Sequence, residues 1–192
     1  MPRKQVITKE LLLNGAFELV KEQGKEQLSA RHLAAKCGCS TQPIFRLYDN
    51  MGDLEKDLLD KCTTFFSDFY KNSKPSSTTP FVDLGMSYIR FAAVYPKLFR
   101  LIFLDASGAD KSMYDLINGG SENNFVINEF RKMKGVSQDD FSLLFMKMWI
   151  FIHGIACMVL QDDFDMTEKE IEELLEGTYL AFADIKIDTI GS

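Results

Sequence analysis

The sequence has little of what most enzymes and metal proteins need. Its 192 residues include only two histidines and four cysteines, and no glycine-rich phosphate-binding loop. Cys37 and Cys39 lack a second cluster at the spacing of metal ligands. No nucleophile–base set or pair of carboxylates can be assembled from the pattern. We therefore expect a protein that is not an enzyme and that holds no catalytic residues, metal or cofactor.

Secretory signals are also missing. Residues 1–10 are polar and charged, so we expect no signal peptide and a protein of the reducing cytoplasm. In that compartment Cys37 and Cys39 are expected to act as small apolar residues in a helical turn, with a redox role as the alternative.

The net charge of −6 argues at first sight against a nucleic-acid partner. The charge is unevenly spread, however. Residues 1–48 carry eight Lys and Arg against four Asp and Glu, and residues 49–192 carry fourteen against twenty-four. A basic N-terminal module followed by an acidic body fits DNA binding by the first part, and two differently solvated surfaces are the alternative.

Residues 141–160 form an apolar run that approaches the length of a membrane span. Lys147 would lie inside the bilayer, and acidic residues flank both ends without a basic anchor. We therefore expect a helix that is buried on more than one face, one against the core and another against a partner subunit.

Residues 28–48 read as two short helices joined by a tight turn, a helix-turn-helix. Ser29 is a good N-cap for the first helix, and Gly38 can take the left-handed conformation that ends it. Ser40 is expected to cap the second helix, where Pro43 is tolerated in the first turn. Ile44, Leu47 and Tyr48 would face inward. The outward residues Thr41, Gln42, Phe45 and Arg46 suit a recognition helix in the DNA major groove.

The other predicted elements are also helical, which makes the fold class all-α. Thr8 caps a first helix that ends at Gly24, and Asn50 caps a long helix of about 20 residues, at 51–71. Residues 72–80 are a loop. Helices are expected at 81–95, 97–104, 111–134 with a bend at its glycines, 141–160, and after the cap residue Thr167.

The N-terminal residues resemble those of TetR-family repressors over positions 7–60. The matching positions are Ala16, Phe17, Gly24, Ser29, Leu33, Ala34, Gly38, Ser40, Phe45, Tyr48 and Leu54. The segment 95–100 (YPKLFR) and Trp149 with His153 and Gly154 resemble one group of C-terminal domains in that family.

The resemblance implies a helix-turn-helix DNA-binding domain at 1–50 and an effector-binding and dimerisation domain at 51–192. In that scheme a homodimer forms through the last two long helices and binds a palindromic operator. A small, largely apolar effector moves the connecting helix at 51–71 and releases the repressor. The expected DNA contacts are Arg3, Lys4, Ser29, Arg31, Ser40, Thr41, Gln42, Phe45, Arg46 and Tyr48.

Two positions depart from the family pattern. The recognition helix carries Phe45 where tyrosine is usual, and Met51 replaces a lysine that commonly opens the next helix. Phe45 cannot donate a hydroxyl hydrogen bond to phosphate, although its ring can touch a thymine methyl group. The alternative to a DNA contact is that Phe45 is a half-buried packing residue. For the whole chain, a TetR-like small-molecule-binding protein with weak or lost operator recognition is the alternative function.

The candidate effector residues are aromatic side chains and one histidine of the C-terminal part. They are Phe69, Phe91, Tyr95, Phe99, Tyr114, Phe125, Trp149 and His153. Most such residues simply fill cores, and a lone histidine on an apolar helix is more often a hydrogen-bonded core group than a ligand contact. The sequence does not identify the effector.

Overall fold

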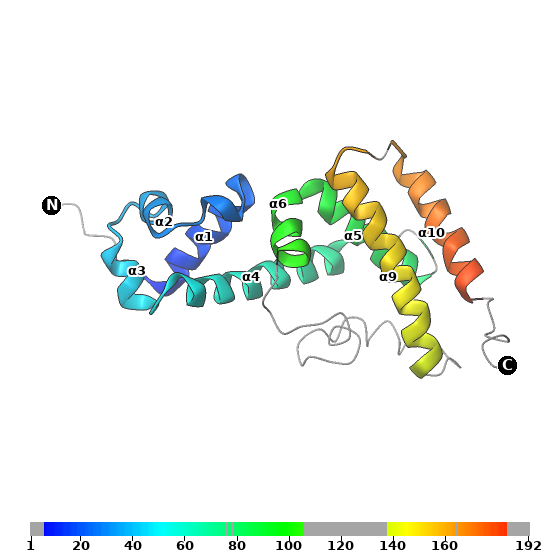
Figure 1. The fold of residues 1–192 in the computed structure, drawn as a ribbon, viewed down its shortest axis with the longest axis horizontal. Coiled ribbons are helices and arrows are strands. Elements are labelled where there is room, and N and C mark those ends of the chain that lie inside the picture. Colours follow the sequence, from blue (N-terminus) through cyan, green and yellow to red (C-terminus); the bar gives the residue numbers. More distant parts are fainter. Residues whose placement is uncertain (1–5, 76, 78, 106–137, 164, 184–192) are drawn as a thin grey trace. The chain divides into compact units, whose positions relative to one another are not determined.

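The computed structural model describes residues 6–75, 77, 79–105, 138–163 and 165–183. These ranges are helical and contain no β-strand, which confirms the all-α class (Figure 1). The expected helix at 111–134 lies outside the described residues. The elements are α1 (Lys9–Gln23), η1 (Lys25–Gln27), α2 (Ala30–Lys36), α3 (Gln42–Leu47), α4 (Met51–Asn72), α5 (Pro80–Val94), α6 (Pro96–Phe99), η2 (Arg100–Leu104), α9 (Gln138–Leu160) and α10 (Glu168–Ala183).

The chain forms two compact units. The first comprises Met1–Asp68 and Tyr95–Ser107, and the second comprises Phe69–Val94 and Gly108–Ser192. This division differs from the expected boundary at residue 50. The reason is that most of α4, together with α6, packs against α1 instead of joining the C-terminal unit.

In the first unit, α1 begins and ends where the sequence predicts. The hydroxyl of Thr8 accepts a hydrogen bond from the backbone N–H of Leu11 at 3.1 Å. Gly24 ends the helix with φ +94°, a conformation that favours glycine. The inward face of α1 is fully buried at Leu12, Ala16 and Val20. The next three helices each add a fully buried residue to the same unit, namely Leu33, Ile44 and Leu54.

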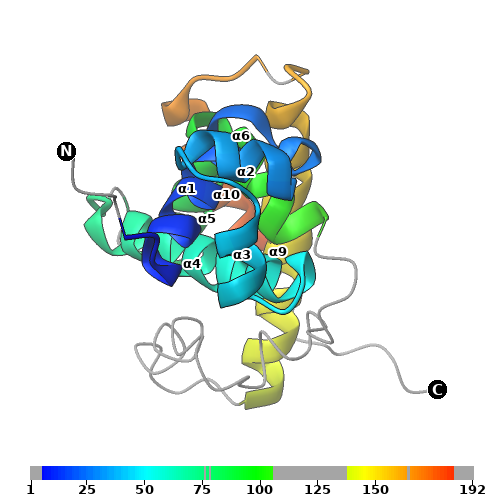
Figure 2. The same cartoon turned by 90° about the vertical axis from the view of Figure 1, so that its left-hand side faces the viewer.

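The predicted helix-turn-helix is present as α2 and α3, which Figure 2 shows joined by a tight turn. The Ser29 hydroxyl accepts from the N–H of His32 at 3.2 Å. Gly38 has φ +64°, and the N–H of Cys39 reaches back to the carbonyl of Ala34 at 2.9 Å. This bond satisfies a carbonyl near the end of α2 that has no partner within the helix.

The start of α3 differs from the prediction. Thr41, not Ser40, occupies the N-cap position, and its side chain makes no capping hydrogen bond. The carbonyl of Thr41 instead accepts from the N–H groups of Ile44 and Phe45. Pro43 has no backbone N–H that would need a hydrogen-bond acceptor. The first turn of this short helix therefore has fewer N–H groups without a partner than most helices have.

The long helix α4 begins with a reciprocal cap. Asn50 Oδ1 accepts from the N–H of Asp53 at 3.1 Å, while Asn50 Nδ2 donates to Asp53 Oδ2 at 3.0 Å. The helix then runs for 22 residues, and its buried stripe in the first unit is Leu54, Leu58 and Cys62. The expected N-cap and length of this helix are therefore confirmed.

The helices that the structure describes in the second unit are the last residues of α4 and α5, α9 and α10. The last three pack on one another (Figure 1). Their approach is close at Gly85 of α5. A Cβ there would lie 2.9 Å from Cδ1 of Ile152 and 3.0 Å from Cδ1 of Leu175, so a larger residue would require these two side chains to shift. The core between them is strongly aromatic, with Phe81, Tyr88, Phe91, Phe141 and Phe145 buried.

The apolar helix α9 is long and apolar enough to cross a membrane, but the core helix of a soluble protein meets the same criteria. It packs against both α5 and α10 through Phe141, Leu144, Phe145, Met148, Ile152, Ile155 and Ala156. Another face leaves Leu143, Ile150 and Met158 exposed. The helix therefore contributes to a core on one side and presents an apolar surface on the other.

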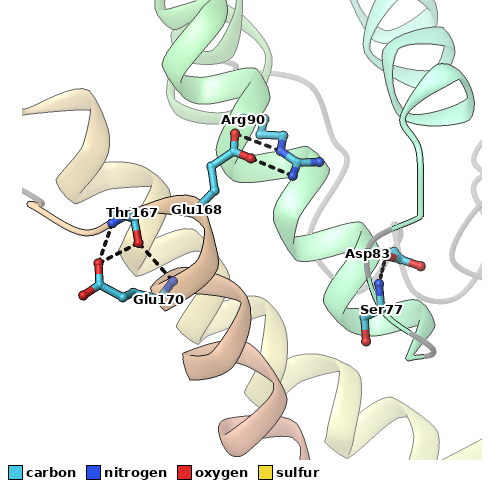
Figure 3. A network of polar contacts seen from close by, with 6 residues as sticks. All are labelled: Ser77, Asp83, Arg90, Thr167, Glu168 and Glu170. Carbon is cyan, nitrogen blue, oxygen red and sulfur yellow. Dashed lines mark hydrogen bonds and ion pairs between the residues drawn. The ribbon is translucent and has the colours of Figure 1, made fainter.

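Polar contacts fix the start of α10 (Figure 3). The Thr167 hydroxyl accepts from the N–H of Glu170, and the Glu170 carboxylate accepts from the N–H of Thr167 at 2.7 Å. Thr167 caps the helix as predicted, and the reciprocal bond from Glu170 makes the pair a capping box. One residue on, Glu168 pairs with Arg90 of α5 through two hydrogen bonds of 3.1 and 2.8 Å.

Candidate nucleic-acid interface

One side of α3 is open to solvent. Thr41, Gln42, Phe45 and Arg46 are exposed, and Phe45 has 52% of its surface accessible. Ile44, between them in sequence, is completely buried. An exposure of about one half fits both a contact to DNA and the half-buried packing role that the sequence left open, so both roles stay predictions.

The neighbouring α2 adds a second set of polar groups. Arg31 and Ser40 are exposed, whereas Ser29 is half-buried and its hydroxyl already caps α2. In the part of the chain that the structure describes, neither Arg31 nor Arg46 forms an ion pair. Both guanidinium groups are therefore available to an anionic partner. Arg3 and Lys4, also expected to contact DNA, lie outside the described residues.

Tyr48 is the expected contact that the structure places elsewhere. Only 4% of its surface is exposed, so it does not share the open side of α3. Its ring lies under the ammonium group of Lys9, 4.6 Å from the ring centre. Burial and the nearby Asp57 carboxylate raise the pKa of Tyr48 to about 12. Tyr48 thus packs at the end of α3 against α1 and α4, and its role as a DNA contact stays a prediction.

Met51, the second departure from the family pattern, is the first residue of α4 and is half-exposed. Its position puts a thioether where the family resemblance implies an ammonium group. The side chain carries no charge, so it cannot neutralise a phosphate.

The described candidate effector residues are divided between the two units. Tyr95 and Phe99 belong to the first unit, where Tyr95 packs edge-on against Phe65 and Phe99 packs against Phe103. The other described candidates belong to the second unit, where Phe69 packs against Phe91, and Trp149 stacks on His153. Tyr114 and Phe125 lie outside the described residues.

A groove in the first unit lies between α1 and α4. It encloses about 380 Å³, and Phe17 and Phe65 line it with the polar residues Asn14, Glu18, Lys61, Thr64 and Asp68. None of the expected effector residues lines this groove. Its mixture of both charge signs with two rings favours no particular ligand.

The second unit holds a constellation that the sequence analysis missed. Tyr88 Oη lies 2.9 Å from Nδ1 of His153, and Sγ of Cys157 lies 3.6 Å from Nε2 of the same imidazole. Burial lowers the pKa of His153 and raises that of Tyr88. The spacing of His153 and Cys157, four residues apart on one helix, was a readable signal. Tyr88 comes from a distant segment, so only the fold could add it.

No protein-family model matches the chain, and no curated protein matches its sequence. Solved structures do match. A TetR-family transcription regulator from Marinobacter aquaeolei VT8 has a TM-score of 0.63 and 19% identity, covering 90% of this chain and 94% of that one. A TetR-like transcriptional regulator from Rhodococcus sp. RHA1 has a TM-score of 0.62 and 14% identity, covering 93% and 97%. At such identities the likeness establishes a shared fold.

Proposed function

From the TetR-type fold of this chain, we propose that it is a DNA-binding transcriptional regulator with α3 as its recognition helix. The observation that carries the proposal is the division of α3 into a buried side and an open side. Ile44 fixes the helix to the core, while Thr41, Gln42, Phe45 and Arg46 remain exposed and project from a rigid support. A helix that reads the major groove needs this combination.

The open residues have chemistry that can distinguish bases. Arg46 can bond two acceptors on guanine, Gln42 can bond the donor and acceptor of adenine, and Phe45 can contact a thymine methyl group. Arg31 on α2 supplies a cation for the phosphate backbone, which positions a protein without reading sequence. Tyr48 supports α3 from within and is left out of this contact set.

We further propose that the chain acts as a homodimer through the apolar faces of α9 and α10. The exposed apolar residues of these helices are Leu143, Ile150, Met158, Leu174 and Leu180. Gly154 and Gly177 are exposed on the same helices, and the absence of side chains allows a partner helix to approach closely. Two-fold symmetry would pair two copies of α3, which is why the proposed operator is palindromic.

The regulator is proposed to be a cytoplasmic repressor that a small, largely apolar molecule releases from DNA. The aromatic core of the second unit, with Phe91, Trp149 and His153, is the region that supports an effector site. An effector can shift the equilibrium only by binding one arrangement of the two α3 helices more tightly than the other. Its identity does not follow from these residues.

A specific observation favours the alternative function, a binding protein that has lost operator recognition. Phe45 and Met51 both lack the polar group that would contact phosphate. Binding of the purified protein to labelled random duplex at low salt separates the two functions, because non-specific affinity depends mainly on phosphate contacts. The regulator should bind, and the single variants Arg31→Ala and Arg46→Ala should each weaken binding. Lys169→Ala, at an exposed position on α10, is the charge-matched control and should not. Absence of binding by the wild type would favour the alternative.

A further inference from the structure

The groove between α1 and α4 has a lining whose charges are ordered, although its composition alone favours no ligand. Two contacts fix how these helices lie. Lys9 Nζ is 2.8 Å from Asp57 Oδ2, and the ring centres of Phe17 and Phe65 are 5.2 Å apart. Both contacts join residues 48 positions apart, so α1 and α4 run side by side in the same direction. The residues of the lining can therefore be placed in order along the groove.

One end of the groove, the cationic end, consists of Lys61 on α4 and Asn14 on α1. The ammonium nitrogen of Lys61 lies 5.5 Å from the centre of the Phe17 ring, at the side of the groove. Among the residues that the structure describes, neither Lys61 nor Asn14 has a hydrogen-bond or ion-pair partner. The ammonium group and the side-chain amide are both donors, so a carboxylate at this end can accept hydrogen bonds from both.

The opposite end, the acidic end, consists of Glu18 on α1 and Asp68 on α4. A rise of about 1.5 Å per residue places them roughly 7–10 Å beyond Lys61 along the shared direction of the helices. Lys21 lies 3.8 Å from Glu18, but a carboxylate has two oxygens and about four sites for donors, so this pair leaves room for a second ammonium group. The acidic end can therefore accept hydrogen bonds from a ligand cation.

Between its two ends the groove is aromatic. Phe17 is buried, and its ring packs edge-on against Phe65, which packs edge-on against Tyr95 at 5.1 Å. These contacts fix the two rings that line the groove. The groove encloses about 380 Å³, within the range of about 300–1,000 Å³ that is usual for small-molecule sites. Fixed rings with a few polar groups at defined places are the usual composition of such a site.

We infer that this groove binds small zwitterions that carry a carboxylate and an ammonium group on opposite sides of an aromatic ring. The carboxylate lies at the cationic end, the ring lies against Phe17 and Phe65, and the ammonium group lies at the acidic end. An α-amino acid is a poor match, because one carbon carries both of its charges and they cannot reach both ends. The site belongs to the first unit, whereas the apolar effector is proposed for the second unit.

The experiment is calorimetric titration of the whole protein at pH 7 with three probes of similar size. 4-(Aminomethyl)benzoate carries both charges, benzoate carries only the carboxylate, and benzylamine carries only the ammonium group. The zwitterion should bind about tenfold or more tightly than either of the other probes, because only it forms charge-assisted hydrogen bonds at both ends.

Two variants test the order of the charges. Lys61→Met keeps most of the side-chain length and should weaken binding of the zwitterion and of benzoate about tenfold, while benzylamine is unaffected. Glu18→Gln combined with Asp68→Asn should weaken binding of the zwitterion and of benzylamine, while benzoate is unaffected. All three positions are at least partly exposed, so the variants should fold, and circular dichroism checks their helical content.

Matched controls remove the same charges from the same helices outside the groove. They are Lys56→Met, and Glu10→Gln combined with Asp60→Asn, at exposed positions that do not line the groove. Neither control should change the affinity for any probe.

The inference is overturned if 4-(aminomethyl)benzoate gives no saturable binding at millimolar concentrations. It is also overturned if Lys61→Met and the double variant at the acidic end leave the affinity unchanged, since the probe would then bind elsewhere. Equal weakening of all three probes by Lys61→Met would contradict the proposed order of the charges. The titrations contain no DNA, so their failure leaves operator recognition by α3 to be judged by its own experiments.

Discussion

The ammonium nitrogen of Lys9 lies 2.8 Å from Oδ2 of Asp57 and thereby joins the first turn of α1 to α4. The same ammonium group lies over the ring of Tyr48, the residue at which α3 ends. One cation of α1 therefore contacts both α4 and the residue at which the proposed recognition helix ends. We expect this contact to hold α3 at a fixed angle in the first unit.

The Lys9 contact makes a prediction for stability against pH. The pKa of Asp57 is lowered, chiefly by the hydrogen bond from Lys9. Slight burial opposes this shift, while the hydrogen bond with Tyr48 and the charge of Lys9 add to it. A carboxyl whose pKa is lower in the folded state stabilises the fold above its unfolded pKa, and the effect is lost as pH falls through the folded pKa. Both partners are partly exposed, so the expected cost of Asp57→Asn at pH 7 is at most about 1 kcal/mol.

Urea unfolding at pH 7 and at about pH 3 measures this effect, since the ordinary pKa of aspartate is about 3.9. The difference between wild type and Asp57→Asn should be present at pH 7 and shrink at the lower pH. Asp60→Asn, at an exposed position on the same helix, is the control and should have little effect at either pH. A difference that grows as the pH falls would contradict the assigned role.

Arg46→Ala separates base reading from phosphate binding. If Arg46 bonds a base edge, discrimination at one operator position should fall by about 1–3 kcal/mol while other positions keep their preferences. Competition binding with single-base operator variants measures this. Equal weakening on every sequence would assign Arg46 to the phosphate backbone, and no change would remove it from the interface.

Met51→Lys tests whether the start of α4 faces DNA. The added cation should strengthen binding to operator and to random duplex by similar factors, and the slope of log K against log salt should become steeper by about one unit. A cation at a helix N-terminus costs roughly 0.3–1 kcal/mol of stability, too little to unfold the unit. Affinities across a salt series provide the measurement. An unchanged slope would mean that residue 51 does not face DNA.

The proposed dimer predicts different outcomes for exposed and buried positions of α9 and α10. Ile150→Arg and Leu174→Arg change partly exposed residues, so they should yield folded monomers that bind operator more weakly. Ile155→Arg is the contrast, because Ile155 is buried and an unpaired charge there should destabilise the second unit itself. Mass in solution and helical content distinguish the two effects. Dimers of unchanged mass in both exposed variants would place the contact elsewhere.

Local signals predicted the first helices well. Thr8, Ser29 and Asn50 each cap a helix as expected, because an N-cap acts through hydrogen bonds to residues only three positions away. Gly38 likewise ends α2 through its own backbone conformation. The start of α3 was misassigned by one residue, since Ser40 and Thr41 are both acceptable caps and the sequence does not rank them.

Features that depend on distant contacts were harder to predict. The packing of Tyr95 on Phe65 brings a later segment into the first compact unit, and helical periodicity gives no sign of this contact. Tyr48 was expected both to face inward and to contact DNA, and its burial confirms the inward orientation. The approach of Tyr88 to His153 joins residues 65 positions apart, which helical periodicity alone does not reveal.

Selection of bound sequences from a random DNA pool by the purified protein tests the central proposal most directly, because it examines DNA recognition and dimer symmetry together. The proposed role of α3 predicts one enriched palindromic site, and Arg46→Ala selected in parallel should relax that site at one position in each half. Recovery of no enriched sequence at low salt would contradict operator recognition by α3. An enriched site without two-fold symmetry would contradict the proposed dimer.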